Sequence, residues 1–205
     1  MLAAYLRHLA ASPWARFADQ PPWRITQGSE ALVAAVAAGL SGTSDWRQAA
    51  DSIVVHRSAV VESAAVLKAP AVIGPRCLVA HGAYLRGGVW LDEDCIVGPG
   101  AELKSSLMFR GSKLAHLNFV GDSIVGAGAN LEAGSVVANY RNERDDKRIR
   151  VRLSAELVTL DVQKFGALVG DDCRIGANAV VAPGALLRPG SVVPRLSLLD
   201  QEAGT

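Results

Sequence analysis

The sequence predicts an all-β protein, a parallel β-helix of six-residue repeats that follows a short helical cap. An aliphatic or aromatic residue recurs at every sixth position in three segments of the chain: Val55, Val61, Leu67, Ile73, Val79, Leu85, Leu91, Val97, Leu103 and Phe109, then Val125, Leu131 and Val137, then Val169, Ile175, Val181, Leu187 and Val193. A small residue follows four places after most of them, as at Ala59, Cys77 and Ala101. Because six residues suit one short strand and a turn, three repeats form one triangular coil. The aliphatic side chains then point inward, and the small residues fit the corners.

Residues 1–50 lack this repeat and show helical spacing instead. Apolar residues stand three or four positions apart in two stretches, Leu2, Tyr5, Leu6 and Leu9, and then Leu32, Val33, Val36 and Leu40. Ser29 is a suitable N-cap for the second helix. We expect this N-terminal helical appendage to cover the open end of the solenoid, whose strand edges would otherwise be exposed.

Two interruptions divide the repeat region, which runs over residues 51–198 and leaves 199–205 as a tail. Counting back in sixes from Val125 gives positions that are out of register with the series ending at Phe109, so we expect a loop at about 104–118. A second loop, called the insert below, covers about 139–165. Its stretch from Arg141 to Arg152 holds six basic and three acidic residues. Such a run is usually a solvated loop, but loops on a rigid scaffold also carry function.

Composition argues against several classes of protein. Half of the residues are hydrophobic, but no apolar run reaches the ~20 residues of a membrane span. A formal net charge of +1 provides no basic surface for nucleic acid or membrane lipid. The first residues lack a secretory signal pattern, and Cys77, Cys95 and Cys173 take small corner positions, so we expect a cytoplasmic protein with buried reduced thiols. Neither a CxxC motif nor the H-x4-H pair of the zinc-dependent γ-type carbonic anhydrases occurs, so no metal site is expected.

The most specific segment is Gly111–Asp122, which reads Gly-Ser-Lys-Leu-Ala-His-Leu-Asn-Phe-Val-Gly-Asp. With Lys-Ser-Ser from Lys104 and Asn-Tyr at 139–140, it resembles the acetyltransferase domain of the bifunctional UDP-N-acetylglucosamine pyrophosphorylase/glucosamine-1-phosphate N-acetyltransferases. The basic insert and the Lys-Phe-Gly run from Lys164 are similar to those of archaeal-type sugar-1-phosphate nucleotidylyltransferases. The resemblance covers residues 50–198. It implies the left-handed β-helix of the LpxA-like superfamily, assembled as a homotrimer with active sites between subunits.

Acetyl transfer from the thioester of acetyl-CoA to an amine needs a base that takes the amine proton. Histidine suits this role near neutral pH, and the resemblance assigns it to His116. A lone histidine in a loop is otherwise more often a surface residue. The tetrahedral intermediate also needs hydrogen-bond donors at its oxyanion. Backbone N–H groups near Asn139 and Tyr140, or the Asn139 side chain, can supply them.

The resemblance also assigns substrate-binding residues. Arg86 and Lys104 match positions that hold the sugar phosphate, and Asn130 matches a position that contacts the sugar. Lys147 and Arg150 fall where archaeal-type relatives carry lysines, so we expect them to bind a ligand phosphate. The alternative for these two residues is a solvated loop whose charges neutralise one another.

Two residues depart from the family pattern. Phe119 stands where the family usually has tyrosine, which leaves at most an apolar wall against the substrate; it also falls on a repeat position and can simply be core. Glu132 replaces a glycine beside Asn130, and a carboxylate there repels a phosphorylated substrate. Both changes weaken the prediction of glucosamine 1-phosphate as substrate more than the prediction of an acyltransferase.

The leading hypothesis is an acetyl-CoA-dependent N-acetyltransferase that acts on an amino-sugar phosphate or a nucleotide sugar. The alternative is a non-catalytic trimeric hexapeptide-repeat scaffold or a sugar-phosphate-binding regulatory module. Acyl-carrier-protein-dependent sugar acyltransferases usually carry a C-terminal helical domain, whereas seven residues follow Leu198 here. No G-x-G-T-R-type phosphate loop occurs, so we expect no nucleotidylyltransferase domain.

Overall fold

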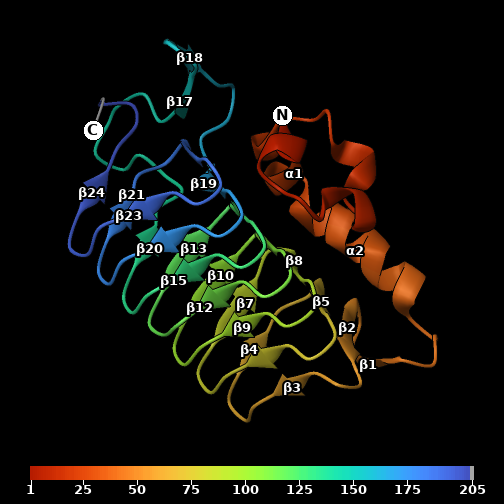
Figure 1. Ribbon diagram of the computed structural model, residues 1–205. Helices are drawn as coiled ribbons and strands as arrows, with labels where there is room; N and C mark the ends of the chain where they lie inside the picture. The colour runs from red at the N-terminus through yellow and green to blue at the C-terminus, as the bar shows by residue number, and fades with distance from the viewer. Residues whose placement is uncertain (204–205) are drawn as a thin grey trace.

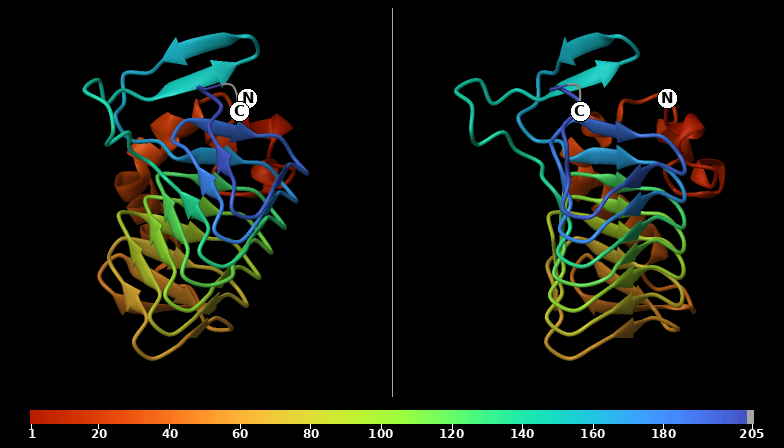
Figure 2. Two further views of the ribbon diagram at one scale, coloured as in Figure 1. Left: turned by 90° about the vertical axis from the view of Figure 1, so that its left-hand side faces the viewer. Right: turned by 60° about the vertical axis from the view of Figure 1, so that its left-hand side comes forward.

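The computed structural model describes residues 1–203 and shows a left-handed parallel β-helix with a helical layer along one side (Figures 1 and 2). Three sheets form the faces of a triangular prism, called faces A, B and C below. Each coil contributes one short strand to each face. Successive strands of one face therefore come from successive coils, as the predicted repeat requires.

The strands of each face stack in chain order. Face A contains β1 (Trp46–Ala50), β2 (Ile53–His56), β5 (Ala71–Ile73), β8 (Val89–Leu91), β11 (Leu107–Met108), β14 (Ile124–Val125), β19 (Ala167–Val169) and β22 (Ala185–Leu187). Face B contains β3 (Val60–Val61), β6 (Leu78–Val79), β9 (Ile96–Val97), β12 (Lys113–Leu114), β15 (Asn130–Leu131), β20 (Arg174–Ile175) and β23 (Val192–Val193). Face C contains β4 (Val66–Leu67), β7 (Tyr84–Arg86), β10 (Glu102–Lys104), β13 (Phe119–Gly121), β16 (Val136–Val137), β21 (Val180–Val181) and β24 (Leu198–Leu199).

The inward side chains form one continuous apolar core. The predicted repeat positions up to Leu103, and again from Val125, all belong to it. Cys77, Cys95 and Cys173 are unoxidised and buried at the corners, where burial raises the pKa of the Cys95 and Cys173 thiols. The predicted pattern of inward aliphatic and small corner residues is therefore confirmed for these segments.

Residues 104–118 do not form the expected loop but continue the coil. Leu85 pairs with Leu103, 18 positions later. In the next pair of coils Leu91 pairs with Met108, only 17 positions later. The coils in this stretch are therefore one residue shorter. A shortened coil moves the later repeats out of register with a period of six, and from the period alone this shift cannot be told from a loop that leaves the prism.

The corner between faces C and A is the part of the coil that is one residue shorter. Ser105 and Asp122 occupy this corner with φ angles of +48° and +46°. The buried hydroxyls of Ser106 and Ser123 accept backbone N–H groups there: Ser123 N donates to Ser106 Oγ at 2.9 Å, and Ala167 N donates to Ser123 Oγ at 3.0 Å. These contacts satisfy backbone groups that the tighter turn would otherwise leave without a partner.

The N-terminal helices cover the side of the prism and not its end, contrary to expectation (Figure 1). They are η1 (Leu2–Ala4), η2 (Leu9–Ala11), η3 (Ala15–Phe17), α1 (Pro22–Gln27) and α2 (Ser29–Leu40). The physical reason is the outward ladder of face A, which is wholly apolar and joins the helices in a second core: Val54, Val72, Trp90, Leu107, Ile124, Leu168 and Leu186. At the N-terminal end of the prism, β1 pairs antiparallel with β2 and covers the edge of face A alone.

Two contacts fasten the helical layer to the prism. The Asp171 carboxylate, in a residue that is 4% exposed, accepts the backbone N–H groups of Arg7 and Ala127, each at 2.7 Å. At the other contact, α2 begins against Gly88. A Cβ atom on Gly88 would lie 2.5 Å from the carbonyl carbon of Ser29, so only glycine permits this approach.

The insert leaves the prism after β16, as expected, and carries a hairpin (Figure 2). Its strands are β17 (Arg150–Leu153) and β18 (Glu156–Thr159). Arg141, which is buried, donates from both terminal nitrogens to the Asp200 carboxylate at 2.8 Å and thereby holds the pKa of Asp200 below its ordinary value. Arg144 and Arg150 both bind Glu202. These ion pairs tie the insert to the C-terminal tail and neutralise three of the six basic side chains between Arg141 and Arg152.

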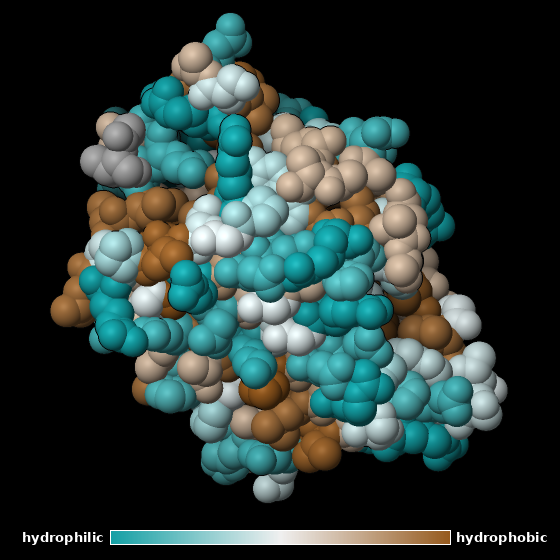
Figure 3. Space-filling model, viewed as in Figure 1, coloured by the Kyte–Doolittle hydropathy of each residue, from teal (hydrophilic) through white to brown (hydrophobic). Residues whose placement is uncertain are grey.

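Face C also presents an outward ladder with apolar members, namely Val66, Tyr84, Glu102, Phe119, Val136, Val180 and Leu198. Val66, Val180 and Leu198 are exposed, unlike the ladder of face A. In the space-filling view, apolar side chains gather near β21 and β24 and again near β4, with hydrophilic side chains between them (Figure 3). An exposed apolar ladder of this length is unusual for an isolated subunit.

We expect Asp171→Ala to lower the free energy of unfolding by about 1–3 kcal/mol, because it leaves two N–H groups without their acceptor. Amide hydrogen exchange should accelerate at Arg7 and Ala127. The matched control is Asp172→Asn, which removes the charge of a surface ion pair with Arg7 and keeps a residue type that tolerates the φ of +58° at this position. It should cost less than about 1 kcal/mol. Equal losses in the two variants would show that Asp171 does not anchor the helical layer.

Candidate active site

The predicted substrate residues meet at the edge of face C that adjoins the shortened corner. Arg86 and Lys104 stack there in adjacent coils, and Gly121 follows in the next. They lie at or beside a groove of about 540 Å³ that is lined by Arg86, Lys104, Phe119, Asn139 and Tyr140, with Gln163 and Lys164 from the end of the insert. Residues from five separate stretches of the sequence are thus brought together.

A shared carboxylate organises this groove. Lys104 Nζ lies 2.7 Å from Asp122 Oδ2, and the Asn139 side-chain amide donates to the same oxygen. The Lys104 and Asp122 side chains are 15% and 8% exposed, so solvent screens their pairing little. Farther along the edge, Arg86 Nε donates to Glu102 Oε1 at 2.7 Å. Both cations assigned to the sugar phosphate are therefore already paired with carboxylates.

Gly121 makes room for this arrangement. A Cβ atom at this position would lie 2.7 Å from both Cγ and Nδ2 of Asn139, and 2.9 Å from Cζ of Phe119. The Phe119 ring therefore lies outside the prism beside the groove and is not part of the core. The reading of Phe119 as a core residue is therefore wrong, and its role as an apolar wall against the substrate stays a prediction.

His116 lies on the opposite edge of face C, at the corner with face B. Its backbone carbonyl accepts Gly134 N at 3.0 Å, and its exposed imidazole has no hydrogen-bond partner within residues 1–203. The next residue, Leu117, has a φ of +54°, and the chain turns there from face B to face C. His116 is not among the residues that line the groove of its own subunit.

Asn130 does not line the groove with Lys104. It stacks above Lys113 on face B and lines a smaller hollow of about 270 Å³ with Glu132, Arg174 and Arg195. Glu132 binds Arg195 through two bonds of 2.7 and 2.8 Å, and this guanidinium holds the pKa of the Glu132 carboxyl below its ordinary value. The predicted site residues thus form two groups, one at the groove beside the shortened corner and one on face B and its corner with face C.

The insert brings one of its two predicted phosphate-binding residues close to the groove. Lys147 Nζ donates to Asn142 O at 2.7 Å and lies 5.6 Å from the centre of the Tyr140 ring, which lines the groove. Arg150 instead pairs with Glu202 of the tail. Three residues at the groove were missing from the sequence-based prediction: Asp122, Gln163 and Lys164. Asp122 stands within the quoted motif, but only the structure shows that two site residues share its carboxylate.

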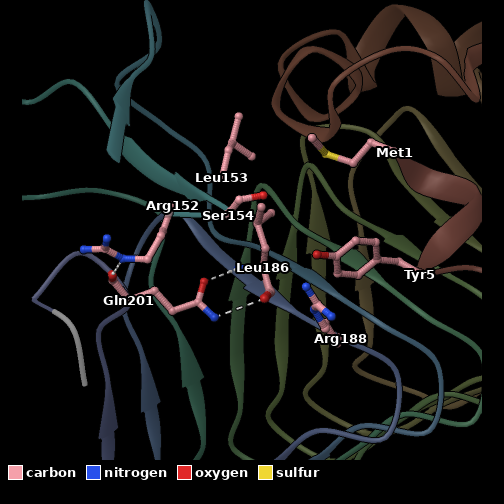
Figure 4. A pocket seen from close by; sticks show the side chains of 8 residues that line it. All are labelled: Met1, Tyr5, Arg152, Leu153, Ser154, Leu186, Arg188 and Gln201. Atoms are coloured by element: carbon pink, nitrogen blue, oxygen red, sulfur yellow. Dashed lines mark hydrogen bonds between the residues drawn. The ribbon is translucent and has the colours of Figure 1, made fainter. Parts of the chain in front are cut away.

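A larger hollow of about 590 Å³ lies elsewhere, between the N-terminus, the hairpin and the last coil (Figure 4). Gln201 closes one side by exchanging two hydrogen bonds with the backbone of Leu186. The hollow is lined by Met1, Tyr5, Arg152, Leu153, Ser154, Leu186, Arg188 and Gln201, which include none of the predicted site residues. The described part of the chain contains no group of three metal-ligating side chains and no helix that is long and apolar enough to cross a membrane.

Comparisons with known proteins agree with the repeat architecture. Residues 70–105 match the family described as bacterial transferase hexapeptide (six repeats), and residues 167–194 match the hexapeptide repeat of succinyl-transferase. Among solved structures, a hexapeptide transferase family protein from Anaplasma phagocytophilum aligns over 70% of each chain, with a TM-score of 0.46 and 15% identity.

Curated relatives are bifunctional proteins. The chain is 33% identical to the bifunctional protein GlmU of Methanococcus vannielii over 58% of its own length and 28% of the relative. It is 30% identical to the bifunctional sugar-1-phosphate nucleotidylyltransferase/acetyltransferase of Sulfurisphaera tokodaii, over 70% of its length and 37% of the relative. The GlmU of Methanocaldococcus jannaschii is 28% identical over 88% of this chain and 44% of that protein. The chain therefore spans less than half the length of these relatives.

We expect Gly121→Ala to turn the Asn139 amide away from Asp122 while the prism stays folded, because the clashing atoms are the ends of side chains. Loss of that hydrogen bond should lower the free energy of unfolding by about 1–2 kcal/mol. A crystal structure and denaturant unfolding of the variant test both points. Gly39→Ala is the control, since an added Cβ there meets no atom within 4 Å. An unmoved Asn139 in the variant would contradict the role given to Gly121.

Proposed function

From a hexapeptide-repeat chain with the left-handed β-helix of the acyltransferase type, we infer an enzyme that transfers an acetyl group from acetyl-CoA to the amine of a sugar phosphate or nucleotide sugar. One observation carries this proposal: Arg86, Lys104, Asn139 and Tyr140, distant in sequence, line one groove. The names of the bifunctional relatives, which include a sugar-1-phosphate nucleotidylyltransferase/acetyltransferase, support the choice of reaction.

His116 is the proposed general base. The amine nitrogen attacks the thioester carbon, a C–N bond forms and the C–S bond breaks. The amine proton passes to the imidazole and then to the departing thiolate of coenzyme A. The exposed imidazole, with no partner in the described part of its own chain, is available for this transfer.

Asn139 is the proposed oxyanion donor. A side-chain carboxamide has two N–H donors, and one of them is bound to Asp122. This bond orients the amide and leaves the second N–H for the oxygen of the tetrahedral intermediate. A donor fixed before the reaction stabilises developing charge without reorganising. Lys104 binds the same carboxylate and thereby holds Asp122 in place.

The separation of His116 from the Lys104–Asn139 edge supports a site between two copies of the chain. In a homotrimer, the His116 edge of one copy meets the Lys104 edge of its neighbour. The helical layer covers the ladder of face A, and the exposed ladder of face C, which lies between the two edges, is the surface proposed for this contact. Closed cyclic assembly repeats this contact three times.

A non-catalytic trimeric hexapeptide-repeat scaffold is the second candidate function. It is favoured by the pairing of Lys104 with Asp122 and of Arg86 with Glu102, because both cations already have structural partners. A scaffold of this kind would transfer no acetyl group. The two candidate functions therefore differ in the effect of removing His116.

We expect His116→Ala to slow acetyl transfer by about 10²- to 10⁴-fold, since a general base is lost. The rate is followed by release of coenzyme A thiol, with glucosamine 1-phosphate and amino-sugar nucleotides as acceptors. His81→Ala is the matched control, because His81 is an exposed histidine at the same corner two coils away. Unfolding stability should stay unchanged in both variants. A wild-type rate in His116→Ala would remove this residue from the mechanism.

A mixing experiment tests the site between copies. His116→Ala and Lys104→Met should each be inactive, and light scattering should give a trimeric mass for both. Trimers that are refolded from an equal mixture should recover about a quarter of the wild-type activity, because each site draws its two edges from different copies. No recovery in mixed trimers, or a monomeric mass, would place both edges of the site in one subunit.

A further inference from the structure

A second hollow continues the groove beyond Lys164. It has a volume of about 360 Å³ and is lined by Gln27, Asp122, Val162, Gln163 and Lys164. Gln163 and Lys164 also line the groove that holds Asn139 and Tyr140. The two spaces therefore adjoin at this pair of residues, and Lys164 stands between them.

The segment 162–165 carries these two residues and is called the rim below. It is fixed to the prism. Val162 and Phe165 are 4% and 0% exposed, so buried side chains hold the rim on both sides of Gln163 and Lys164. Phe165 N donates to Asn139 O at 3.1 Å, which ties the rim to the site residue itself. Gln163 and Lys164 are exposed between these anchors and are held over the shortened corner.

Charge along the groove places an anion at its middle. Arg86 and Lys104, at the sugar end, are each paired with a carboxylate. The Lys164 ammonium has no carboxylate within ion-pair distance in residues 1–203. Lys147, whose ammonium contacts Asn142 O and the Tyr140 ring, also has no carboxylate partner in this range. Of these two uncompensated cations, Lys164 is the one that lines both spaces and can meet a ligand phosphate there.

The second hollow offers the groups that recognise a nucleobase. Gln27 Oε1 accepts from Arg24 Nη1 at 2.9 Å, and Arg24 also pairs with Asp161 of the insert. This bond orients the Gln27 amide and leaves its two N–H donors without a partner in the described structure. Gln163 adds a second carboxamide, and Val162 gives an apolar surface. N–H donors match the carbonyl oxygens of uracil, thymine and guanine.

We propose that the acceptor is a nucleoside diphosphate sugar, with its pyrophosphate at Lys164 and its base between Gln27 and Gln163. This inference rests on the proposed function of the same groove and decides between the two acceptor classes left open there. It also gives the N-terminal helices a part in specificity, because Gln27 is the last residue of α1.

Titration calorimetry with UDP, dTDP, GDP and glucosamine 1-phosphate tests the proposal. At least one nucleoside diphosphate should bind about tenfold more tightly than glucosamine 1-phosphate. Gln27→Ala and Gln163→Ala should each weaken nucleotide binding by about 3- to 10-fold. Gln27→Ala should leave glucosamine 1-phosphate binding unchanged, because Gln27 lines only the second hollow. Lys164→Ala should weaken nucleotide binding about tenfold, with a smaller effect at high salt.

Matched controls exist for both residue types. Gln20→Ala and Lys113→Ala alter exposed side chains away from the groove and should change nothing. Unchanged nucleotide affinity in both glutamine variants overturns the proposal. ADP and coenzyme A are titrated in parallel, because loss of their binding alone in these variants would assign the hollow to the acyl donor and also overturn it.

Failure of this inference is distinguishable from failure of the proposed function. Nucleotide binding that depends on Gln27 and Gln163, without acetyl transfer by the wild-type protein, would reject the acyltransferase and keep the nucleotide site. Acetylation of glucosamine 1-phosphate, without binding of any of the three nucleoside diphosphates, would keep the acyltransferase and reject the nucleotide site.

Discussion

Each coil of the prism must place its three inward side chains above those of the coil before it. Parallel strand pairing holds neighbouring coils about 4.8 Å apart, and a slip by one residue would turn the inward set outward. The chain can therefore change length only at its corners. It loses one residue at Ser105 and again at Asp122, and it gains the insert after β16. The groove is built from these irregular corners, where side chains are released from the core.

Sequence periodicity predicted the regular coils well, because each inward position needs a buried aliphatic side chain. It could not tell a shortened corner from an ejected loop, since both displace the later repeats. Phe109 shows the difficulty: it continues the count of six, yet it packs outside the prism against Trp90. The period of six also could not predict which side of the prism the helices cover. That depends on the outward residues of face A, including Trp90 and Leu107, which the inward count ignores.

The motif predicted which residues would be near the site but not how they divide. Lys104 and Asn139 share Asp122 on one edge of face C, whereas His116 lies at the corner of faces B and C and Asn130 lies on face B. Residues next to one another in a motif can face opposite edges, because a strand of three residues spans the whole face. Glu132 shows a related limit. Its carboxylate was predicted to repel a phosphate, but it is bound by Arg195 from two coils away.

The buried Arg141 connects the groove to the end of the chain. It binds Asp200 and the backbone carbonyl of Pro183, while Glu202 holds Arg144 and Arg150. The ion pairs of the tail therefore hold the insert in place, and the far end of the insert forms the rim of the groove. A protein truncated before Asp200 would retain every complete repeat and yet lose the support of that rim. A purification tag fused at the C-terminus of this chain lies outside the repeats, yet it can disturb the ion pairs that support the rim and so alter ligand binding at the groove.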